Sequence, residues 1–199
     1  LRTFQNYSWS FQGDPVGVFV RDVFSRETQL ALGQPGERGI YAHLYLNGVY
    51  WGIFNTCERP EANFGATYFG GTAEDYDVIK VEAGSYTLNA TDGNMTAWTR
   101  LYNRCKAGIT NNSAYFSLAG RRPDGTPDPA GETLLDIDNL IDYQLVIFYG
   151  GNYDASVSRF LGDTRPNNWY GLRDRSGKNG GFKFVSHDAE HSLKADEPT

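Results

Sequence analysis

The residues best suited to chemistry gather between positions 151 and 191. Asp154 follows a Gly-Asn-Tyr sequence, an amide pair comes next at Asn167 and Asn168, and Asp188 follows a short apolar run. Such groups are costly to bring together unless a cation or a reaction uses them. Taken singly, each residue could instead cap a turn or meet solvent. The stretch as a whole favours a cation-dependent site.

Two histidines, His187 and His191, flank the second acid with the i, i+4 spacing of a zinc motif. Three features count against zinc. The preceding run reads as a strand rather than a helix, the acid beside His187 is Asp rather than Glu, and no third ligand follows. A zinc-dependent hydrolase is therefore the less favoured alternative.

Three basic residues are further candidates for binding an anion. Lys80 lies between Ile79 and Val81, where it could reach a phosphate or extend its ammonium group to solvent. Arg159 and Arg165 follow Asp154 and could bind an anionic substrate group, although solvent exposure is the favoured interpretation.

Composition limits the remaining possibilities. The 199 residues suffice for one substantial core or two small ones, and a hydrophobic content of 40% predicts a folded chain. The net charge of −6, without a basic block, argues against binding to nucleic acid or to an anionic membrane. No apolar run approaches the ~18 residues of a membrane span. Because the sequence begins at Leu1, we interpret it as a fragment of a longer protein.

The interpretation of two further sequence patterns depends on the cellular compartment of the protein. Cys57 and Cys105 would form one disulfide in an exported chain or stay free, and their spacing fits no metal motif. Glycosylation sequons, which are at least as well explained as chance matches, occur at Asn6, Asn89, Asn94 and Asn111.

The elements that must position these residues are read from periodicity and turn signals. The Asn47-Gly48 pair between two β-rich runs predicts a hairpin, residues 40–46 and 49–55. Apolar spacing predicts a helix over 16–32 that Asp14 and Pro15 begin. We also expect a short helix over 61–69, a strand over 75–81, a polar loop over 83–93 and a helix over 94–106.

The C-terminal half contains the strongest helix pattern. Residues 107–133 are rich in breakers and resemble a joint between two lobes. Residues 134–149 are hydrophobic nearly all round, which predicts a buried helix that Asp136 or Asp138 caps and Gly150-Gly151 ends. Strands over 168–173 and 182–185 follow, and the second delivers Asp188.

Several of these segments, in this order, resemble the signatures of the CotH kinase family, named for a spore coat protein. They are residues 44–52 (LYLNGVYWG), 58–60 (ERP), 140–143 (LIDY), 151–154 (GNYD), 167–170 (NNWY) and 182–188 (FKFVSHD), within a resemblance from about residue 20 to 193. The resemblance implies an α+β, divergent, two-lobed protein-kinase-like fold with ATP between the lobes. We expect a single domain over 1–199, N-lobe-like over 1–120 and C-lobe-like over 130–199, with an incomplete C-terminal lobe.

The resemblance also implies the roles of the site residues. Asp154 is the catalytic acid that accepts or positions the substrate hydroxyl, and Asp188 holds Mg²⁺, with Asn168 and Asn167 at the second metal position. The expected nucleotide contacts are Lys80, its support Glu58, and Phe182. The partners so implied are ATP, Mg²⁺ and the Ser or Thr hydroxyls of secreted, coat or surface proteins.

Two departures from the spore-coat members leave activity open. The segment between Asp154 and the Asn pair, residues 155–166, is longer than the corresponding segment of those members. His187 also stands where those members tend to have Trp. A conventional Gly-rich phosphate loop is also missing from the sequence, as in the family. A non-catalytic kinase-like module of a large extracellular protein is therefore the first alternative, and a metal-dependent hydrolase is the second.

Overall fold

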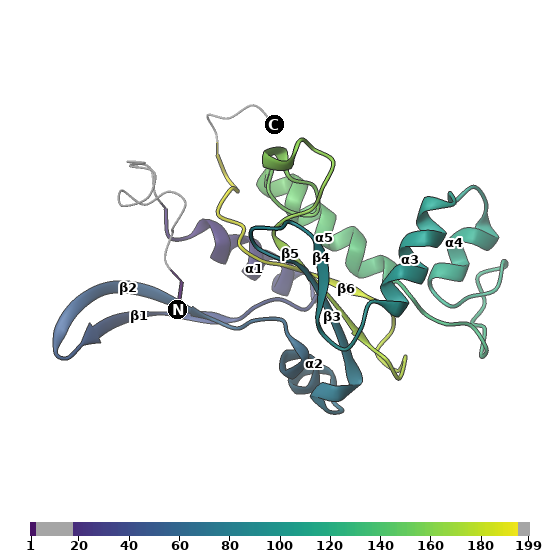
Figure 1. Ribbon diagram of the computed structural model, residues 1–199, viewed down its shortest axis with the longest axis horizontal. Helices are drawn as coiled ribbons and strands as arrows, with labels where there is room; N and C mark the ends of the chain where they lie inside the picture. Colours follow the sequence, from purple (N-terminus) through teal and green to yellow (C-terminus); the bar gives the residue numbers. More distant parts are fainter. Residues whose placement is uncertain (3–17, 195–199) are drawn as a thin grey trace.

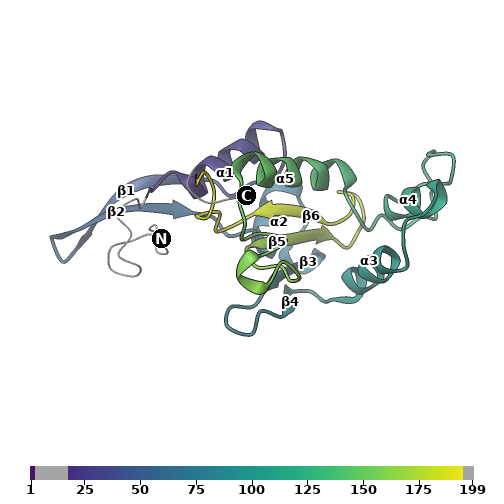
Figure 2. The same ribbon diagram turned by 90° about the horizontal axis from the view of Figure 1, so that it is seen from above.

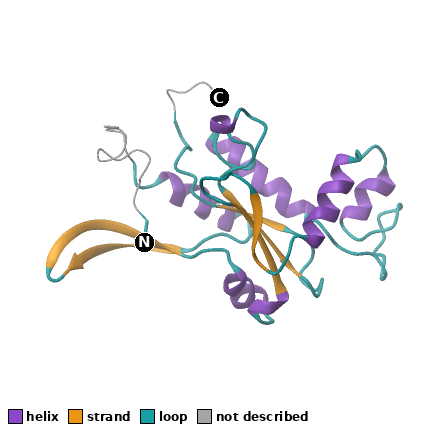
Figure 3. Ribbon diagram, in the orientation of Figure 1, coloured by secondary structure: helices purple, strands orange, loops and turns teal. Residues whose placement is uncertain are grey.

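The computed structural model describes residues 1–2 and 18–194 (Figure 1). Helices and strands are mixed in the α+β manner that the sequence predicts, as Figure 3 shows. The helices are α1 (Arg21–Ala31), α2 (Ala62–Phe69), α3 (Thr96–Lys106), α4 (Asn112–Leu118) and α5 (Ile137–Gly150). The strands are β1 (Gly39–Leu46), β2 (Val49–Cys57), β3 (Tyr76–Val81), β4 (Leu88–Asp92), β5 (Trp169–Asp174) and β6 (Lys183–Ser186).

A four-stranded antiparallel sheet in the order β4-β3-β5-β6 carries the core on both faces. One face packs Ile79 and Trp169 against α5 and α3, and the other packs Val78 and Tyr170 against α2. The view from above in Figure 2 shows α1 and α5 together over one side of the sheet. Strands from both halves of the chain thus share one sheet. The division into two lobes stays a prediction.

The predicted hairpin is confirmed as β1 and β2, which form a separate two-stranded sheet that projects from the body (Figure 1). Asn47 and Gly48 have φ values of 50° and 82°, the left-handed pair that a type I′ turn requires. Side chains on both faces of this hairpin are exposed, because the body of the molecule does not cover them.

Two elements were missed because their local signals are weak. β4 lies within the expected polar loop, and its hydrogen bonds to β3 hold it in place. α4 lies within the expected joint, and the side chain of Asn111 caps it. The predicted helices over 61–69 and 94–106 and the strands over 75–81, 168–173 and 182–185 are confirmed to within a few residues.

Helix α1 differs from its prediction in which face it buries. Its buried residues are polar, whereas Val20 at its start is 52% exposed. The prediction that α1 buries an apolar stripe was therefore wrong, because the buried face of this helix forms ion pairs and hydrogen bonds. Asp14, Pro15, Asn6 and residues 16–17 lie outside the described residues, and the helix begins at Arg21, later than the predicted start at residue 16.

Helix α5 has the predicted caps but not the predicted burial. The carboxylate of Asp136 accepts a hydrogen bond from the N–H of Asn139, and Gly151 ends the helix in the left-handed conformation. Phe148 and Tyr149 are 75% and 78% exposed, so the expectation of a helix buried on all sides was wrong. Tyr143 and Ile147 form the buried stripe.

Several other expectations concern chemistry at the surface. Cys57 and Cys105 are free thiols, and the three sequons within the described residues, Asn89, Asn94 and Asn111, are exposed. Within residues 1–2 and 18–194, no helix is both long enough and apolar enough to cross a membrane.

Candidate active site

Asp154 lies in the turn that follows α5. Gly151 ends the helix with φ 59°, and the side-chain oxygen of Asn152 then accepts a hydrogen bond from the backbone N–H of Asp154 at 3.0 Å. The carboxylate is 3% exposed and accepts hydrogen bonds from Ser158 Oγ at 2.5 Å and from Asn167 Nδ2 at 3.0 Å. These donors hold the carboxylate in one orientation.

Asn168 joins the two predicted acids. Its Nδ2 donates to Oδ2 of Asp154 at 2.9 Å and to the backbone oxygen of Asp188 at 3.3 Å. The register of β5 and β6, in which Trp169 pairs with Ser186, brings the residues before β5 and after β6 to the same end of the sheet. The sheet thereby assembles three residues that the sequence assigned to one site.

Asp188 occupies an unusual backbone conformation. Its φ of 51° is in the left-handed region, which costs about 1 kcal/mol or more for a residue with a side chain. The N–H of the next residue, Ala189, donates to Asp22 Oδ1 at 2.9 Å, which helps to hold this turn.

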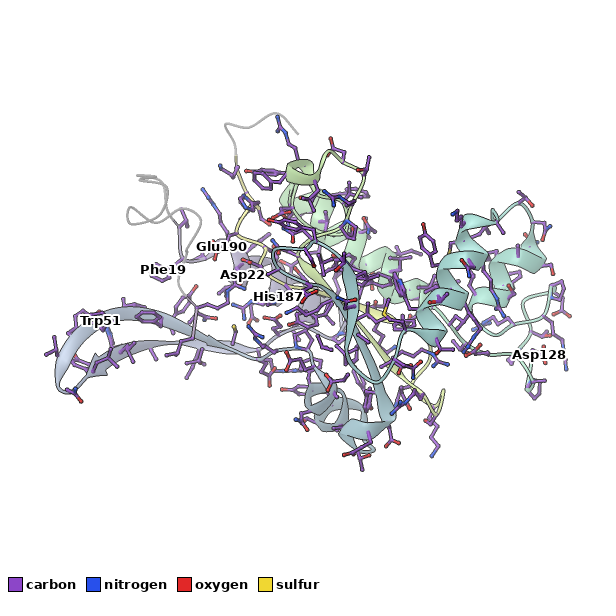
Figure 4. All side chains as sticks on the ribbon, in the orientation of Figure 1. Phe19, Asp22, Trp51, Asp128, His187 and Glu190 are labelled. Atoms are coloured by element: carbon purple, nitrogen blue, oxygen red, sulfur yellow. The ribbon has the colours of Figure 1, made fainter. Side chains whose placement is uncertain are left out.

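A basic residue that the sequence did not single out, Arg2, contacts the carboxylate of Asp188. Its guanidinium also donates to Glu190 Oε1 at 3.0 Å and lies 3.7 Å from Asp22 Oδ2. Figure 4 shows Asp22 and Glu190 on the same side of the molecule, near His187. Burial lowers the pKa of Arg2, but the charges of Asp188 and Asp22 outweigh it and the pKa is raised.

Arg2 reaches this position through the hairpin. Its backbone pairs with Asn55 of β2, with N–H to O distances of 2.7 and 2.9 Å. The partner acids lie 20 to 188 residues away in the sequence, so neither motif nor periodicity could have identified the contact. An isolated Arg near the start of a chain carries no local signal.

Two cavities of about 320 Å³ each meet at Asp188. The first also contains the predicted acid Asp154 and the amide pair, and is lined by Ala83, Gly84, Tyr86, Asp154, Phe160, Asn167, Asn168, Asp188 and His191. The second contains the basic groups and is lined by Leu1, Arg2, Cys57, Arg59, His187, Asp188 and Glu190. A larger cavity of about 630 Å³ beside α5 is mainly apolar and contains neither Asp154 nor Asp188. The chemistry therefore favours the two smaller cavities.

Comparison with known protein families decides which family this is. A family profile described as CotH kinase protein matches residues 13–198. The chain belongs to the CotH kinase family. No curated protein matches the chain. The resemblance read from the sequence signatures is thus confirmed over nearly the whole length.

Three residues expected to contact the nucleotide in this CotH domain lie elsewhere. Lys80 donates to the hydroxyl of Tyr170 at 3.2 Å, and burial raises the pKa of Tyr170 to about 12. Glu58 accepts hydrogen bonds from the N–H of Arg38 at 3.0 Å and from Tyr68 at 2.5 Å. Among the described residues, no hydrogen bond or ion pair joins Glu58 to Lys80, so the expected pairing is not found.

Phe182 is a core residue. Its side chain is fully buried, and its ring lies 5.3 Å from that of Trp98. Its backbone N–H donates to the oxygen of Leu134 and its own oxygen accepts from Asp136. Its side chain lines neither cavity at Asp188, so its expected contact with the nucleotide stays a prediction.

The two histidines do not converge on one point. His187 Nδ1 lies 2.5 Å from Glu37 Oε1, whereas His191 Nε2 lies 3.8 Å from Asp154 Oδ2. The segment that carries them is not helical, and no group of three His, Cys, Asp or Glu residues in the described part could hold a metal ion. The two imidazoles therefore do not form the helical i, i+4 pair of that zinc motif.

The oxygen groups around the first cavity do suit Mg²⁺. Mg²⁺ prefers oxygen ligands and keeps several waters, so one or two carboxylates with an amide oxygen suffice. Asp188 and Asn168 supply such oxygens, because the amide NH₂ of Asn168 is already used by Asp154 and its oxygen is the remaining polar atom. Arg2 and Asp188 both line the second cavity.

Proposed function

We propose that this CotH domain is an ATP- and Mg²⁺-dependent protein kinase that phosphorylates Ser or Thr hydroxyls of secreted, coat or surface proteins. The observation that carries the proposal is the link from Asp154 through Asn168 to Asp188 around one cavity. Phosphoryl transfer needs positioning and charge neutralisation rather than a covalent intermediate, and this arrangement supplies both.

Asp154 is the residue that would receive the proton of the substrate hydroxyl. Transfer breaks the bond between the γ-phosphorus of ATP and the bridging oxygen of ADP, and forms a bond from phosphorus to the hydroxyl oxygen. Ser158 and Asn167 hold the carboxylate in one orientation, so it needs no reorganisation when the proton arrives. Because Asn167 donates to both oxygens of Asp154, we assign it to this orientation rather than to a metal contact.

Asp188 and Asn168 would hold the cation. Mg²⁺, when bound, would neutralise charge on the phosphate oxygens. Asn168 keeps the backbone of Asp188 at a defined distance from Asp154, which relates the cation site to the proton acceptor.

We propose that Arg2 makes the phosphate contact that the family resemblance implied for Lys80. The second cavity contains two guanidinium groups, Arg2 and Arg59, beside Asp188, and guanidinium groups bind phosphate oxygens well. Asp22 on α1 contacts Arg2 as Glu58 was expected to contact Lys80. We therefore propose that the phosphates of ATP reach from the first cavity, which Asp154 lines, past Asp188 into this second cavity.

The first test is calorimetry of ATP binding with and without Mg²⁺. Wild type should bind in a Mg²⁺-dependent manner, Asp188→Ala should lose this binding, and the exposed acid variant Asp138→Ala should keep it. A phosphotransfer assay on Asp154→Ala should then show a loss of about 10² to 10⁴ in rate with nucleotide affinity kept. Absence of nucleotide binding by the folded wild type would refute the proposal.

A second candidate function is a non-catalytic binding module. Arg2 already neutralises the carboxylate of Asp188, which is the residue that a cation would need. This function would be indicated by Mg²⁺-independent nucleotide binding in wild type, together with no measurable transfer to any protein substrate.

A further inference from the structure

The hairpin of β1 and β2 differs in composition from the rest of the chain. No Asp, Glu, Lys or Arg occurs from Gly39 to Cys57, although Arg38 and Glu58 flank it directly. Ile40 and Tyr45, which point to opposite faces of β1, are 70% and 60% exposed. Val49 and Trp51 on β2 are 62% and 63% exposed. Exposed apolar surface on both faces of one hairpin indicates an interaction surface.

The outer edge of β1 is the part of this surface that limits the kind of partner. Among the described residues β1 pairs with β2 alone, whereas the outer edge of β2 pairs with Arg2 at Asn55. An edge strand presents a row of backbone N–H and C=O groups, and natural proteins usually protect such edges with charges or Pro. β1 has neither. A lipid cannot satisfy these backbone groups, but another strand can.

We propose that this edge is a dimerisation surface, on which β1 of a second copy of the chain pairs antiparallel with β1. The partner strand must be uncharged and apolar on both faces, and β1 itself has these properties. Pairing two hairpins yields a four-stranded sheet, which is more stable than an isolated two-stranded hairpin. The hairpin projects from the body (Figures 1 and 2), so pairing at its edge keeps the bodies of the two chains, which each carry a formal net charge of −6, apart.

The symmetry of such a pair predicts its register. A two-fold axis perpendicular to the sheet must lie midway between the two copies of one residue, because residues directly opposite each other share a face. An axis at His43 places Ile40 opposite Leu46 of the second copy and Tyr41 opposite Tyr45. This register uses the edge from residue 40 to 46 and leaves Arg38 outside the paired segment. Aromatic and aliphatic cross-strand pairs of this kind stabilise a sheet.

Sedimentation velocity over a range of protein concentrations tests the proposal. Wild type should show a concentration-dependent monomer–dimer equilibrium. Tyr45→Lys, at an exposed position of β1, should be monomeric because it places a charge at the paired edge. Val49→Lys, equally exposed but on β2, should still dimerise. Circular dichroism should show the same secondary structure in all three proteins.

Disulfide cross-linking tests the register. With Cys57 and Cys105 replaced by Ser, the His43→Cys variant should form a disulfide-linked dimer on mild oxidation, and the Val49→Cys variant should not. The proposal is overturned if wild type is monomeric at every concentration, or if both Lys variants lose dimerisation equally. It is also overturned if monomeric wild type floats with neutral phosphatidylcholine vesicles, which would indicate a lipid partner instead.

Discussion

Arg2 Nε lies 3.7 Å from Oδ2 of Asp22, which connects the strand-like start of the chain to helix α1 at the edge of the candidate active site. Asp22 also lies 3.2 Å from Arg26 Nε and accepts the N–H of Ala189. The same Arg2 guanidinium contacts Asp188. The position of α1 is therefore coupled to that of the residue proposed to hold the cation.

The Arg2→Gln substitution should weaken binding of ATP with Mg²⁺ by about tenfold or more. A hydrogen bond to a charged group contributes about 1.5–3 kcal/mol, and each 1.4 kcal/mol is tenfold in affinity. Calorimetry measures the effect. Lys80→Gln is the matched control, because Lys80 contacts Tyr170 and lines neither cavity at Asp188. A larger loss of ATP affinity in Lys80→Gln than in Arg2→Gln would indicate that Lys80, and not Arg2, contacts the phosphates.

The Asp22→Asn substitution should destabilise the fold by about 3 kcal/mol, because it leaves the buried charge of Arg26 without its carboxylate. Urea unfolding followed by circular dichroism measures this free energy. The exposed acid on the same helix is the control, and Glu27→Gln should change stability by less than about 0.5 kcal/mol. Equal effects of the two substitutions would contradict a specific role for the Asp22 network.

Alkylation of Cys57 should report on the second cavity. Burial, assisted by the negative charge of Glu37, raises the pKa of this thiol. A raised thiol pKa lowers the thiolate fraction at any pH below it, so the rate should be low near neutrality and increase as pH rises beyond the usual thiol range. ATP with Mg²⁺ should slow the reaction, because Cys57 lines the cavity proposed for the phosphates.

Cys105 is the internal control for that experiment. Burial raises its thiol pKa as well, but it lies on α3 and lines neither cavity at Asp188. Its rate should have a similar pH dependence and no response to nucleotide. Protection of both thiols to the same extent would indicate a general tightening of the fold instead of occupancy of the cavity.

The Gly151→Ala substitution should cost about 1 kcal/mol or more, since Gly151 adopts the left-handed conformation with φ 59°. It should also reduce phosphotransfer, because the turn that it distorts positions Asn152 and Asp154. Thermal unfolding and a transfer assay measure the two effects. The preceding helical residue is the control: in Gly150→Ala the new methyl would meet Ser192 at an ordinary 3.6 Å, so stability should stay the same or rise.

Elements with strong local signals were predictable from sequence. The Asn47-Gly48 pair adopts the backbone angles that only a few residue types tolerate, so it defines the hairpin without help from the rest of the fold. The cap of α5 by Asp136 and its end at Gly151 have the same local origin. β4 and α4 were missed because a pairing with β3 and a tertiary environment stabilise sequences with weak intrinsic preference.

The sequence alone determined the family through the order of its motifs and the hairpin through Asn47-Gly48. It also singled out Asp154, Asn168 and Asp188, which hydrogen bonds join in the fold. Only the tertiary structure decided which basic residue joins them. The register of β3 and β5 pairs Lys80 with Tyr170, whereas an antiparallel bridge to Asn55 brings Arg2 to Asp188 across 186 residues of chain. Contacts of this kind depend on sheet register and long-range pairing, which residue type and local spacing do not encode.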